Sequence, residues 1–231
     1  MSVPDPPAPA AGYRQNRFLV PPTAADLLLI RHGESEPAHP GSPFPLVGGH
    51  ADPALAPEGH AQAQRIGQRL ATAGIGAIYV TPLRRTAQTA EPLARLLGLT
   101  PRVEPELREV NLGEWEGGRY RKMVAERHPM AVRMWQEERW DVIPGAERSE
   151  AFAARVRAAI TRLASRHAGQ QVAVFTHGGV IGQVLALAAA SRPFAFITSD
   201  NGSISRLVAD GERWIIRGFN DTAHLEDHHR A

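Results

Sequence analysis

Three short apolar runs constrain the fold of this chain more than any other feature of its sequence. They occupy residues 27–30, 78–80 and 172–175, and polar residues follow each of them at once. Such a run is typical of a strand buried on both faces, as in a parallel sheet with helices on either side. We therefore expect the three runs to form strands at the centre of the fold.

The segments between and after these runs have the residue spacing of helices. They are residues 57–74, 82–97, 119–139, 147–167 and 178–190. In the better patterned ones, apolar residues recur at steps of three and four and so share one helix face. Proline lacks the backbone N–H that donates a hydrogen bond inside a helix. We therefore expect Pro92 to interrupt the second segment early and Pro129 to divide or kink the third. Gly74 is expected to close the first.

Strands that alternate with helices predict an α/β fold. Such chains form a mostly parallel sheet with helices on both faces, a three-layer α/β/α sandwich. Residues 203–208 and 214–219, joined through Asp210 and Gly211, predict a closing β-hairpin. Sheets of this kind bind ligands beyond the carboxyl ends of their strands, so the residues after each apolar run are the first place to look for a site.

We expect one globular domain over residues 26–223. The hydrophobic content of 43% suffices for a sizeable core in a chain of 231 residues. Residues 1–25 are rich in Pro and Ala without periodicity, which predicts a flexible leader. Residues 224–231 are expected to form a polar tail.

The composition excludes several classes of function. The chain has 26 Lys and Arg against 24 Asp and Glu, and no run of basic residues indicates nucleic-acid binding. The lack of cysteine excludes disulfides, thiolate nucleophiles and Cys-ligated metal centres. No apolar stretch approaches the roughly 20 residues of a membrane span, and no signal peptide is recognisable, so we expect a soluble, cytoplasmic protein.

The residues that follow the three apolar runs share one chemistry. They are Arg31-His32-Gly33-Glu34-Ser35, Thr81-Pro82-Leu83-Arg84-Arg85 and Thr176-His177-Gly178-Gly179. Two or three arginines and two histidines therefore meet at one edge of the sheet, where like charges repel one another unless an anion is shared. Phosphate fits, because arginine forks match its oxygens and helix N-termini offer backbone N–H groups to it. These residues predict a phosphate site.

The motifs resemble those of the histidine phosphatase superfamily, also called phosphoglycerate-mutase-like. They are residues 31–35, 81–90, 107–109 and 176–179, with further agreement at 55–59 and 113–117. The resemblance spans residues 26–223. It implies a phosphoglycerate-mutase-like fold and a metal-independent enzyme without a cofactor, which takes the phosphoryl group of a small phosphorylated substrate onto its own histidine. The sequence also lacks His-Glu-x-x-His, calcium-loop and Walker motifs. The sequence leaves open whether the protein forms a homodimer.

The resemblance assigns a role to each site residue. It makes His32 the nucleophile, Glu109 the proton donor, and Arg31, Arg85, His177 and the backbone of Gly178 the phosphate ligands. The motif position selects Arg85 rather than Arg84, which is expected at the surface. Glu114 and Glu116 are the alternatives to Glu109.

The remaining histidines are expected to lie at the surface or in the tail. They are His60, His128, His167, His224, His228 and His229. His39 and His50 are better candidates for a substrate contact, because they fall in the loop after the nucleophile. In this loop Ala38 replaces an asparagine that many members of the family carry, so we expect that contact to be absent or supplied by a neighbour.

Three functions are compatible with these residues. A phosphatase acting on phosphomonoesters is favoured, because His177-Gly178-Gly179 differs from the His-Gly-Asn-Ser of mutases that resemble phosphoglycerate mutase, and residues 117–147 lack their long insertion. The alternatives are such a mutase and a phosphate-binding scaffold without turnover.

An apolar group of side chains is expected to cap the pocket and to favour substrates with apolar character. Its members are Phe44, Trp115, Tyr120, Met123, Met134, Trp135 and Trp140. Met123 and Met134 are equally well explained as core residues.

Overall fold

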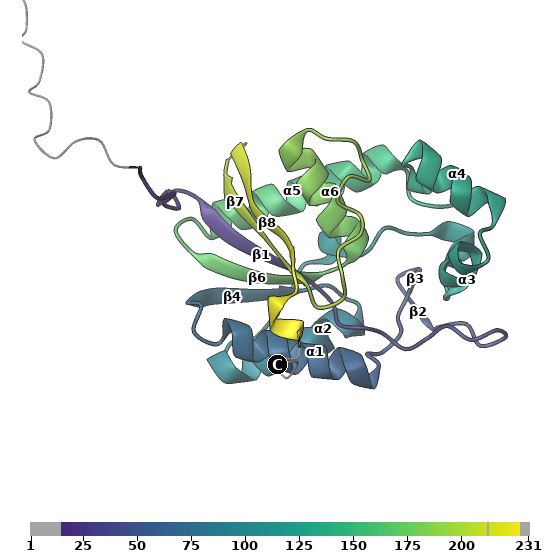
Figure 1. Ribbon diagram of the computed structural model, residues 1–231, viewed down its shortest axis with the longest axis horizontal. Helices are drawn as coiled ribbons and strands as arrows, with labels where there is room; N and C mark the ends of the chain where they lie inside the picture. The colour runs from purple at the N-terminus through teal and green to yellow at the C-terminus, as the bar shows by residue number, and fades with distance from the viewer. Residues whose placement is uncertain (1–14, 212, 227–231) are drawn as a thin grey trace, which may run out of the picture.

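A six-stranded sheet forms the centre of the computed structural model, which describes residues 15–211 and 213–226 (Figure 1). The strand order is β5-β4-β6-β1-β7-β8. The strands are β1 (Ala25–Arg31), β4 (Ile75–Val80), β5 (Arg102–Val103), β6 (Gln171–Thr176), β7 (Ile204–Asp210) and β8 (Arg213–Asp221). The first four in this order run parallel, and β7 lies antiparallel between β1 and β8. The predicted strands and closing hairpin are confirmed.

Helices cover both faces of the sheet (Figure 1). They are α1 (Pro57–Leu70) and α2 (Arg84–Leu97) on one face, and α5 (Ser149–Arg166) and α6 (Gly178–Ala189) on the other. Alternate residues of β1 point to opposite faces, so that Leu28 and Ile30 pack with α1 and α2, and Leu27 and Leu29 with α5 and α6. The predicted three-layer α/β/α sandwich is confirmed.

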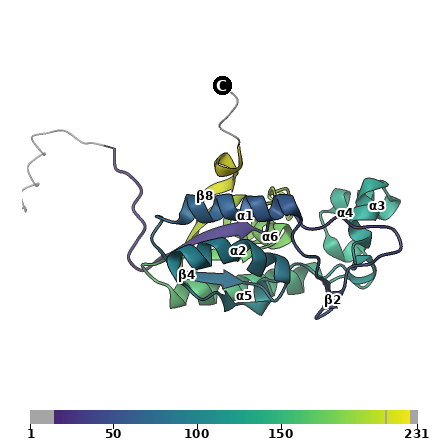
Figure 2. The same cartoon turned by 90° about the horizontal axis from the view of Figure 1, so that it is seen from below.

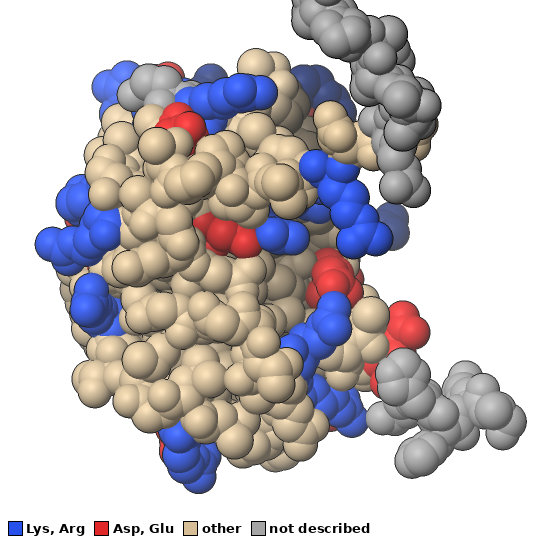
Figure 3. Space-filling model, turned by 90° about the vertical axis from the view of Figure 1, so that its left-hand side faces the viewer, with Lys and Arg blue, Asp and Glu red and all other residues tan. Residues whose placement is uncertain are grey.

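A smaller group of elements lies at one end of the molecule, beyond the carboxyl ends of the parallel strands (Figures 1 and 2). It comprises α3 (Arg119–Ala125), α4 (Pro129–Glu137) and the ribbon of β2 (Leu46–Val47) and β3 (His50–Ala51). The break predicted from Pro129 is confirmed, because α4 begins there. At the opposite end most of the surface is uncharged, with Lys and Arg scattered around it (Figure 3).

Short 3-10 turns complete the regular structure. They are Pro105–Leu107, Gly113–Trp115, Trp140–Val142 and Ala223–Leu225. None of the helices in the described ranges is long and apolar enough to cross a membrane.

The prediction that Pro92 interrupts a helix is wrong. α2 is continuous, with Pro92 buried inside it. A Cβ added to Gly67 of α1 would come within 3.1 Å of the Pro92 Cβ, so the two helices meet closely at this point. The packing of the two helices offsets the loss of the backbone hydrogen bond that proline cannot make. α1 ends at Leu70, and Gly74 lies in the following turn with a φ of 74°.

The ends of the predicted domain differ slightly from the structure. β1 begins at Ala25, one residue before the predicted start, and Ala24 and Ala25 are buried. Residues 1–14 of the predicted leader, and residues 227–231 of the predicted tail with His228 and His229, lie outside the described residues.

Candidate active site

The ends of two strands and the start of one helix bring the predicted site residues together. His32 follows β1, and His177 follows β6, which pairs with β1. The two imidazole rings lie edge to face, with centroids 5.3 Å apart. Arg85 comes from the first turn of α2 and is 7% exposed. The predicted convergence at the sheet edge is confirmed.

The His32 ring is held in one protonation state. Its Nδ1 lies 2.7 Å from the carbonyl oxygen of Gly33, and because a carbonyl only accepts, Nδ1 carries the proton. Burial lowers the pKa of His32 well below its usual value, and the charges of Arg85 and Arg31 lower it further. The ring is therefore neutral at physiological pH, with a lone pair on Nε2. A neutral imidazole is the form that attacks phosphorus.

His177 is fully buried and is held by threonine hydroxyls. Its Nε2 lies 3.0 Å from Thr81 Oγ1, which lies 3.1 Å from Thr86 Oγ1. Burial and the charge of Arg85 hold the pKa of His177 well below its usual value. Its Nδ1 is buried and has no partner among the described residues. This nitrogen therefore leaves a hydrogen-bonding position for a ligand beside the nucleophile.

Arg31 and Arg85 add two guanidinium groups. Arg31 donates from Nη1 to the carbonyl of Ser199, and its buried Nε has no partner within the described part of the chain. Arg85 donates from Nη1 to the carbonyl oxygen of Ala51 at 2.8 Å. Burial lowers the pKa of Arg85 to about 10, so the group remains charged at neutral pH. Both arginines keep further N–H donors for an anion.

Arg84 binds elsewhere, although it is the neighbour of Arg85. Its backbone N–H donates to Asp52 Oδ1 at 2.8 Å, and its Nε donates to the Asp52 carbonyl oxygen at 2.8 Å. The side chain is 46% exposed. The predicted surface position is confirmed.

The Glu109 carboxylate lies against the start of α6. Its Oε2 accepts from the backbone N–H of Gly179 at 3.2 Å, and its Oε1 from that of Val110 at 3.0 Å. It lines the same pocket as His32 and Arg85. A Cβ on Gly179 would overlap Glu109 Oε1, so this position admits only glycine without a shift of the carboxylate.

The two alternative carboxylates are less well placed. Glu114 is exposed and lines neither pocket of the site. Glu116 also lines the inner pocket, but its oxygens accept shorter hydrogen bonds than those of Glu109, from the backbone N–H groups of Ala51 at 2.6 Å and Leu112 at 2.9 Å. The placement therefore favours Glu109 as the proton donor.

Arg155 of α5 holds the Glu109 loop, a role that the sequence analysis missed. It donates to the carbonyl oxygens of Glu106 at 2.6 Å, Arg108 at 2.9 Å and Glu109 at 3.0 Å. It also pairs with Glu147 at 2.6 Å, and this outweighs burial in holding the pKa of Glu147 below its usual value. The sequence gives one indication of this role, because Arg155 is a charged residue on the apolar face of its helix.

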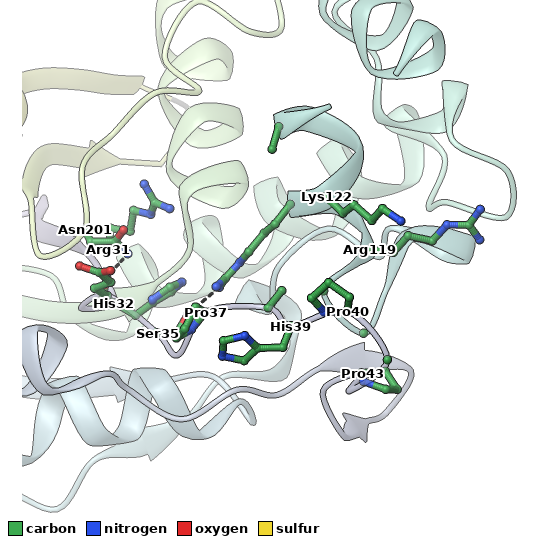
Figure 4. A pocket seen from close by; sticks show the side chains of 17 residues that line it. Arg31, His32, Ser35, Pro37, His39, Pro40, Pro43, Arg119, Lys122 and Asn201 are labelled. Atoms are coloured by element: carbon green, nitrogen blue, oxygen red, sulfur yellow. Dashed lines mark hydrogen bonds between the residues drawn. The ribbon is translucent and has the colours of Figure 1, made fainter. Parts of the chain in front are cut away.

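Two adjacent pockets share Arg31 and His32. The inner pocket, of about 250 Å³, also contains Arg85 and Glu109. The outer pocket, of about 750 Å³, lies between the loop of residues 34–43 and α3 (Figure 4). Within residues 15–211 and 213–226, no group of three or more His, Asp or Glu side chains is arranged to hold a metal ion.

The predicted apolar cap is confirmed in part. Phe44, Trp115, Tyr120 and Trp140 line the inner pocket. Met134 is fully buried in the core, and Met123 packs against the same core. Trp135 is 39% exposed and packs edge to face on Phe194, so its predicted place in the cap is wrong.

Two of the other histidines lie at the site, and one lies in the core. His50 is buried beside the inner pocket, where its Nδ1 donates to the Gly48 carbonyl oxygen at 3.0 Å, and His39 lines the outer pocket. His167 is 4% exposed and bonds Tyr79 Oη at 2.9 Å, which makes its predicted surface position wrong. The two residues lie 88 positions apart, so no local pattern reveals this contact.

Two further residues reach the nucleophile loop from distant elements. Arg121 of α3 donates from Nη2 to Ser35 Oγ and from Nη1 to the Glu36 carbonyl oxygen, each at 2.7 Å. Asn201 donates from Nδ2 to the His32 carbonyl oxygen at 3.0 Å. Neither residue belongs to a recognisable motif. A polar side chain from α3 therefore lies near the loop of Ala38, which lines the same pocket as Arg121.

Comparisons with known proteins agree with this geometry. The chain is 32% identical over 208 residues to phosphoglycerate mutase-like protein 4 of Arabidopsis thaliana, covering 88% of each chain. It is 31% identical over 202 residues to phosphoserine phosphatase 1 of Hydrogenobacter thermophilus, covering 86% of this chain and 93% of the relative.

The fold is also that of a solved phosphatase. The structure of a mycobacterial glucosyl-3-phosphoglycerate phosphatase matches with a TM-score of 0.70 and 27% identity, over 86% of this chain and all of that one. The family model of the histidine phosphatase superfamily (branch 1) matches residues 27–222. The chain therefore belongs to the histidine phosphatase superfamily.

Proposed function

We propose that this protein hydrolyses phosphomonoesters through a phosphohistidine formed on His32. The observation that carries the proposal is the state of His32 within its surroundings. Its ring is neutral, with Nδ1 bound to the Gly33 carbonyl, and buried nitrogens of Arg31 and His177 beside it have no partner among the described residues. An uncharged nucleophile among unused donors suits a phosphoryl group.

In the first step, His32 Nε2 attacks phosphorus opposite the leaving oxygen. The N–P bond forms as the P–O bond breaks, and Glu109 gives its proton to the leaving oxygen. Arg31 and Arg85 bind the oxygens of the phosphoryl group, and His177 donates from Nδ1 while the Thr81 hydroxyl donates to its Nε2. The backbone of Gly178, at the start of α6, adds the electrostatics of a helix N-terminus.

In the second step, water attacks the phosphohistidine. Glu109, now ionised, takes a proton from the water as the N–P bond breaks, and inorganic phosphate leaves. His32 and Glu109 return to their starting states. The positive charge of Arg31 and Arg85 stabilises the transition state in both steps, which supports a reaction without a metal ion.

Two observations favour hydrolysis over mutase activity. His177-Gly178-Gly179 lacks the Gly-Asn-Ser sequence that follows this histidine in mutases resembling phosphoglycerate mutase. The segment between Gly117 and Glu147 forms only α3, α4 and a 3-10 turn, without a long insertion. A phosphoserine phosphatase and a glucosyl-3-phosphoglycerate phosphatase are among its relatives, although others are named as mutase-like or as probable phosphoglycerate mutases.

The test uses a labelled phosphomonoester with EDTA present. We expect release of inorganic phosphate and an acid-labile phosphate on the protein, which disappears in His32→Ala. Complete loss of activity on chelation would contradict the metal-free reaction. Isomerisation of a bisphosphorylated glycerate faster than phosphate release would indicate a mutase, and phosphate binding without labelling or turnover would indicate a scaffold.

A further inference from the structure

The 199–202 loop, which lies in the chain between α6 and β7, holds the segment that carries the nucleophile. Arg31 donates from Nη1 to the carbonyl oxygen of Ser199, the single hydrogen bond of its guanidinium within the described residues. The backbone N–H of Gly202 is shared between the carbonyl oxygens of Arg31 at 3.1 Å and His32 at 3.2 Å. The positions of a phosphate ligand and of the nucleophile therefore depend on this loop.

The guanidinium of Arg31 has few neighbours that fix its direction. A Cβ added to Gly178 would lie 3.3 Å from Arg31 Nε, so the group lies between the start of α6 and the loop. Burial lowers the pKa of Arg31, and the negative charges of Glu109 and Asp200 oppose this shift. A side chain with so many rotatable bonds keeps one orientation only where its neighbours hold it. The carbonyl oxygen of Ser199 supplies that constraint on Nη1.

An irregularity in the sheet lies beside this loop. The pairing of β7 with β8 shifts between Ile204 and Arg206, so that two residues of β8 stand opposite Ser205. One of the two is Asn220, whose backbone has a φ of 55° and whose N–H donates to Ser205 Oγ at 3.2 Å. Such a bulge redirects a side chain away from the regular alternation of a strand.

The redirected side chain of Asn220 forms two hydrogen bonds with Asp200. Its Oδ1 accepts from the backbone N–H of Asp200 at 2.6 Å, and its Nδ2 donates to Asp200 Oδ2 at 2.7 Å. A positive φ is uncommon outside glycine, and it persists where surrounding contacts hold it. Asp200 directly follows Ser199, so the bridge ties β8 to the residue whose carbonyl oxygen receives Arg31.

We propose that Asn220 is a positioning residue for the reaction, which fixes the loop through Asp200 and thereby holds the Arg31 guanidinium where it binds the phosphoryl group. This inference rests on the proposed hydrolysis of phosphomonoesters and adds a residue that does not touch the substrate. Asn220 and Asp200 line neither the inner nor the outer pocket. The effect of Asn220 therefore passes through Arg31.

The experiment removes each half of the bridge. Asn220→Gly deletes the side chain and keeps the backbone, because glycine adopts a positive φ without strain. We expect kcat/KM for a phosphomonoester to fall about tenfold, less than the roughly 10²-fold that a misplacement of 1 Å can cause. Asp200→Ala should cause a similar loss, and the double variant should be no worse than either, since all three lack the same bridge.

Two further variants serve as controls. Ala190→Gly is matched to Asn220→Gly, because Ala190 also has a positive φ, of 50°, and lies outside both pockets at the end of α6. It should leave kcat/KM unchanged. Asp200→Asn keeps an oxygen for Asn220 Nδ2 and should retain most of the activity. A loss as large as that of Asp200→Ala would assign the effect to the charge of Asp200 and overturn the bridge.

The Arg31→Gln background separates positioning from general damage. There the group that Asn220 positions is gone, so adding Asn220→Gly should change kcat/KM by no more than about twofold. Any loss in the free energy of unfolding, measured with urea, should be the same in both backgrounds. A tenfold loss of kcat/KM that persists in Arg31→Gln, or an unchanged kcat/KM in Asn220→Gly alone, would overturn the inference.

Phosphate binding separates this inference from the proposed function. Calorimetry with inorganic phosphate measures the contribution of Arg31 without turnover. Weaker phosphate binding by Asn220→Gly, with no hydrolysis by the wild type, would refute the phosphatase and retain the positioning role. Hydrolysis and phosphate affinity that are both unchanged in Asn220→Gly would do the reverse. A wild type that neither hydrolyses phosphomonoesters nor binds phosphate would refute both.

Discussion

The inner and outer pockets are built in different ways. His32, Arg85 and His177, which line or adjoin the inner pocket, are at least nine-tenths buried and lie at the ends of paired strands or the start of a helix. The outer pocket is bounded by a loop and by α3, none of whose residues is buried. Buried side chains with several fixed partners have one arrangement, whereas exposed ones tolerate substitution. The comparison indicates that the side chains around His32 are held more rigidly than those of the outer pocket.

Adjacent arginines provide the sharpest test of this division. We expect Arg85→Gln to lower kcat/KM on the order of 10² to 10³-fold, because it removes a donor to the charge that develops in the transition state. Arg84→Gln removes a half-exposed contact with Asp52 and should cost at most about fivefold. Steady-state kinetics on one phosphomonoester measures both. Similar losses in the two variants would mean that Arg85, in the inner pocket, matters no more to the reaction than Arg84 at the surface.

Gly179→Ala tests the inner pocket without removing a functional group. The added Cβ would overlap Glu109 Oε1 and displace the carboxylate. We expect hydrolysis of an alkyl phosphate to fall by about 10²-fold, the lower end of the effect of general acid catalysis, and that of an aryl phosphate with a good leaving group to fall less. Gly218→Ala is the control, because a Cβ there meets nothing within 4 Å. An equal loss for both leaving groups would mean that Glu109 does not donate the proton.

The sequence predicted the inner pocket far better than the outer one. The chemistry of Arg31, His32 and His177 follows directly after buried strands, and strand ends meet at one edge of a sheet, so local pattern was sufficient. Arg121 reaches Ser35 across 86 positions and Arg155 reaches Glu109 across 46, contacts that only tertiary packing creates. Local rules also failed where packing outweighed them, as at Pro92 inside α2 and His167 against Tyr79.

The inner pocket should contribute to the pH dependence of stability. The pKa values of buried His32 and His177 lie well below their usual value, so between that value and the lowered one the unfolded chain binds protons that the folded chain does not. The free energy of unfolding should therefore fall as pH drops below about 6.5, by up to about 1.4 kcal/mol per pH unit for each histidine. Above about pH 7 this contribution is complete.

Urea unfolding at a series of pH values checks this. His32→Asn and His177→Asn should each flatten the dependence between about pH 6.5 and 5. His60→Asn, at an exposed histidine of α1, is the matched control. An unchanged slope in both site variants would mean that these histidines are protonated in the folded protein.

Two tryptophans test the smallest difference, between the wall of the inner pocket and the surface beside it. Trp140 is 7% exposed and lines the pocket, and Trp135 is 39% exposed, yet both pack on Phe194 with ring centroids 4.9 and 5.5 Å away. We expect Trp140→Leu to lower the preference for benzyl over ethyl phosphate by a few fold, since an aromatic contact is worth about 1 kcal/mol. The two leaving groups are both alkoxides, so the ratio of their kcat/KM values isolates binding of the ring. Trp135→Leu should leave that ratio unchanged, and thermal unfolding of both variants controls for damage to the shared contact with Phe194. If both substitutions change the ratio equally, the cause is a displacement of Phe194, which both tryptophans contact. The apolar wall of the inner pocket then does not select the substrate.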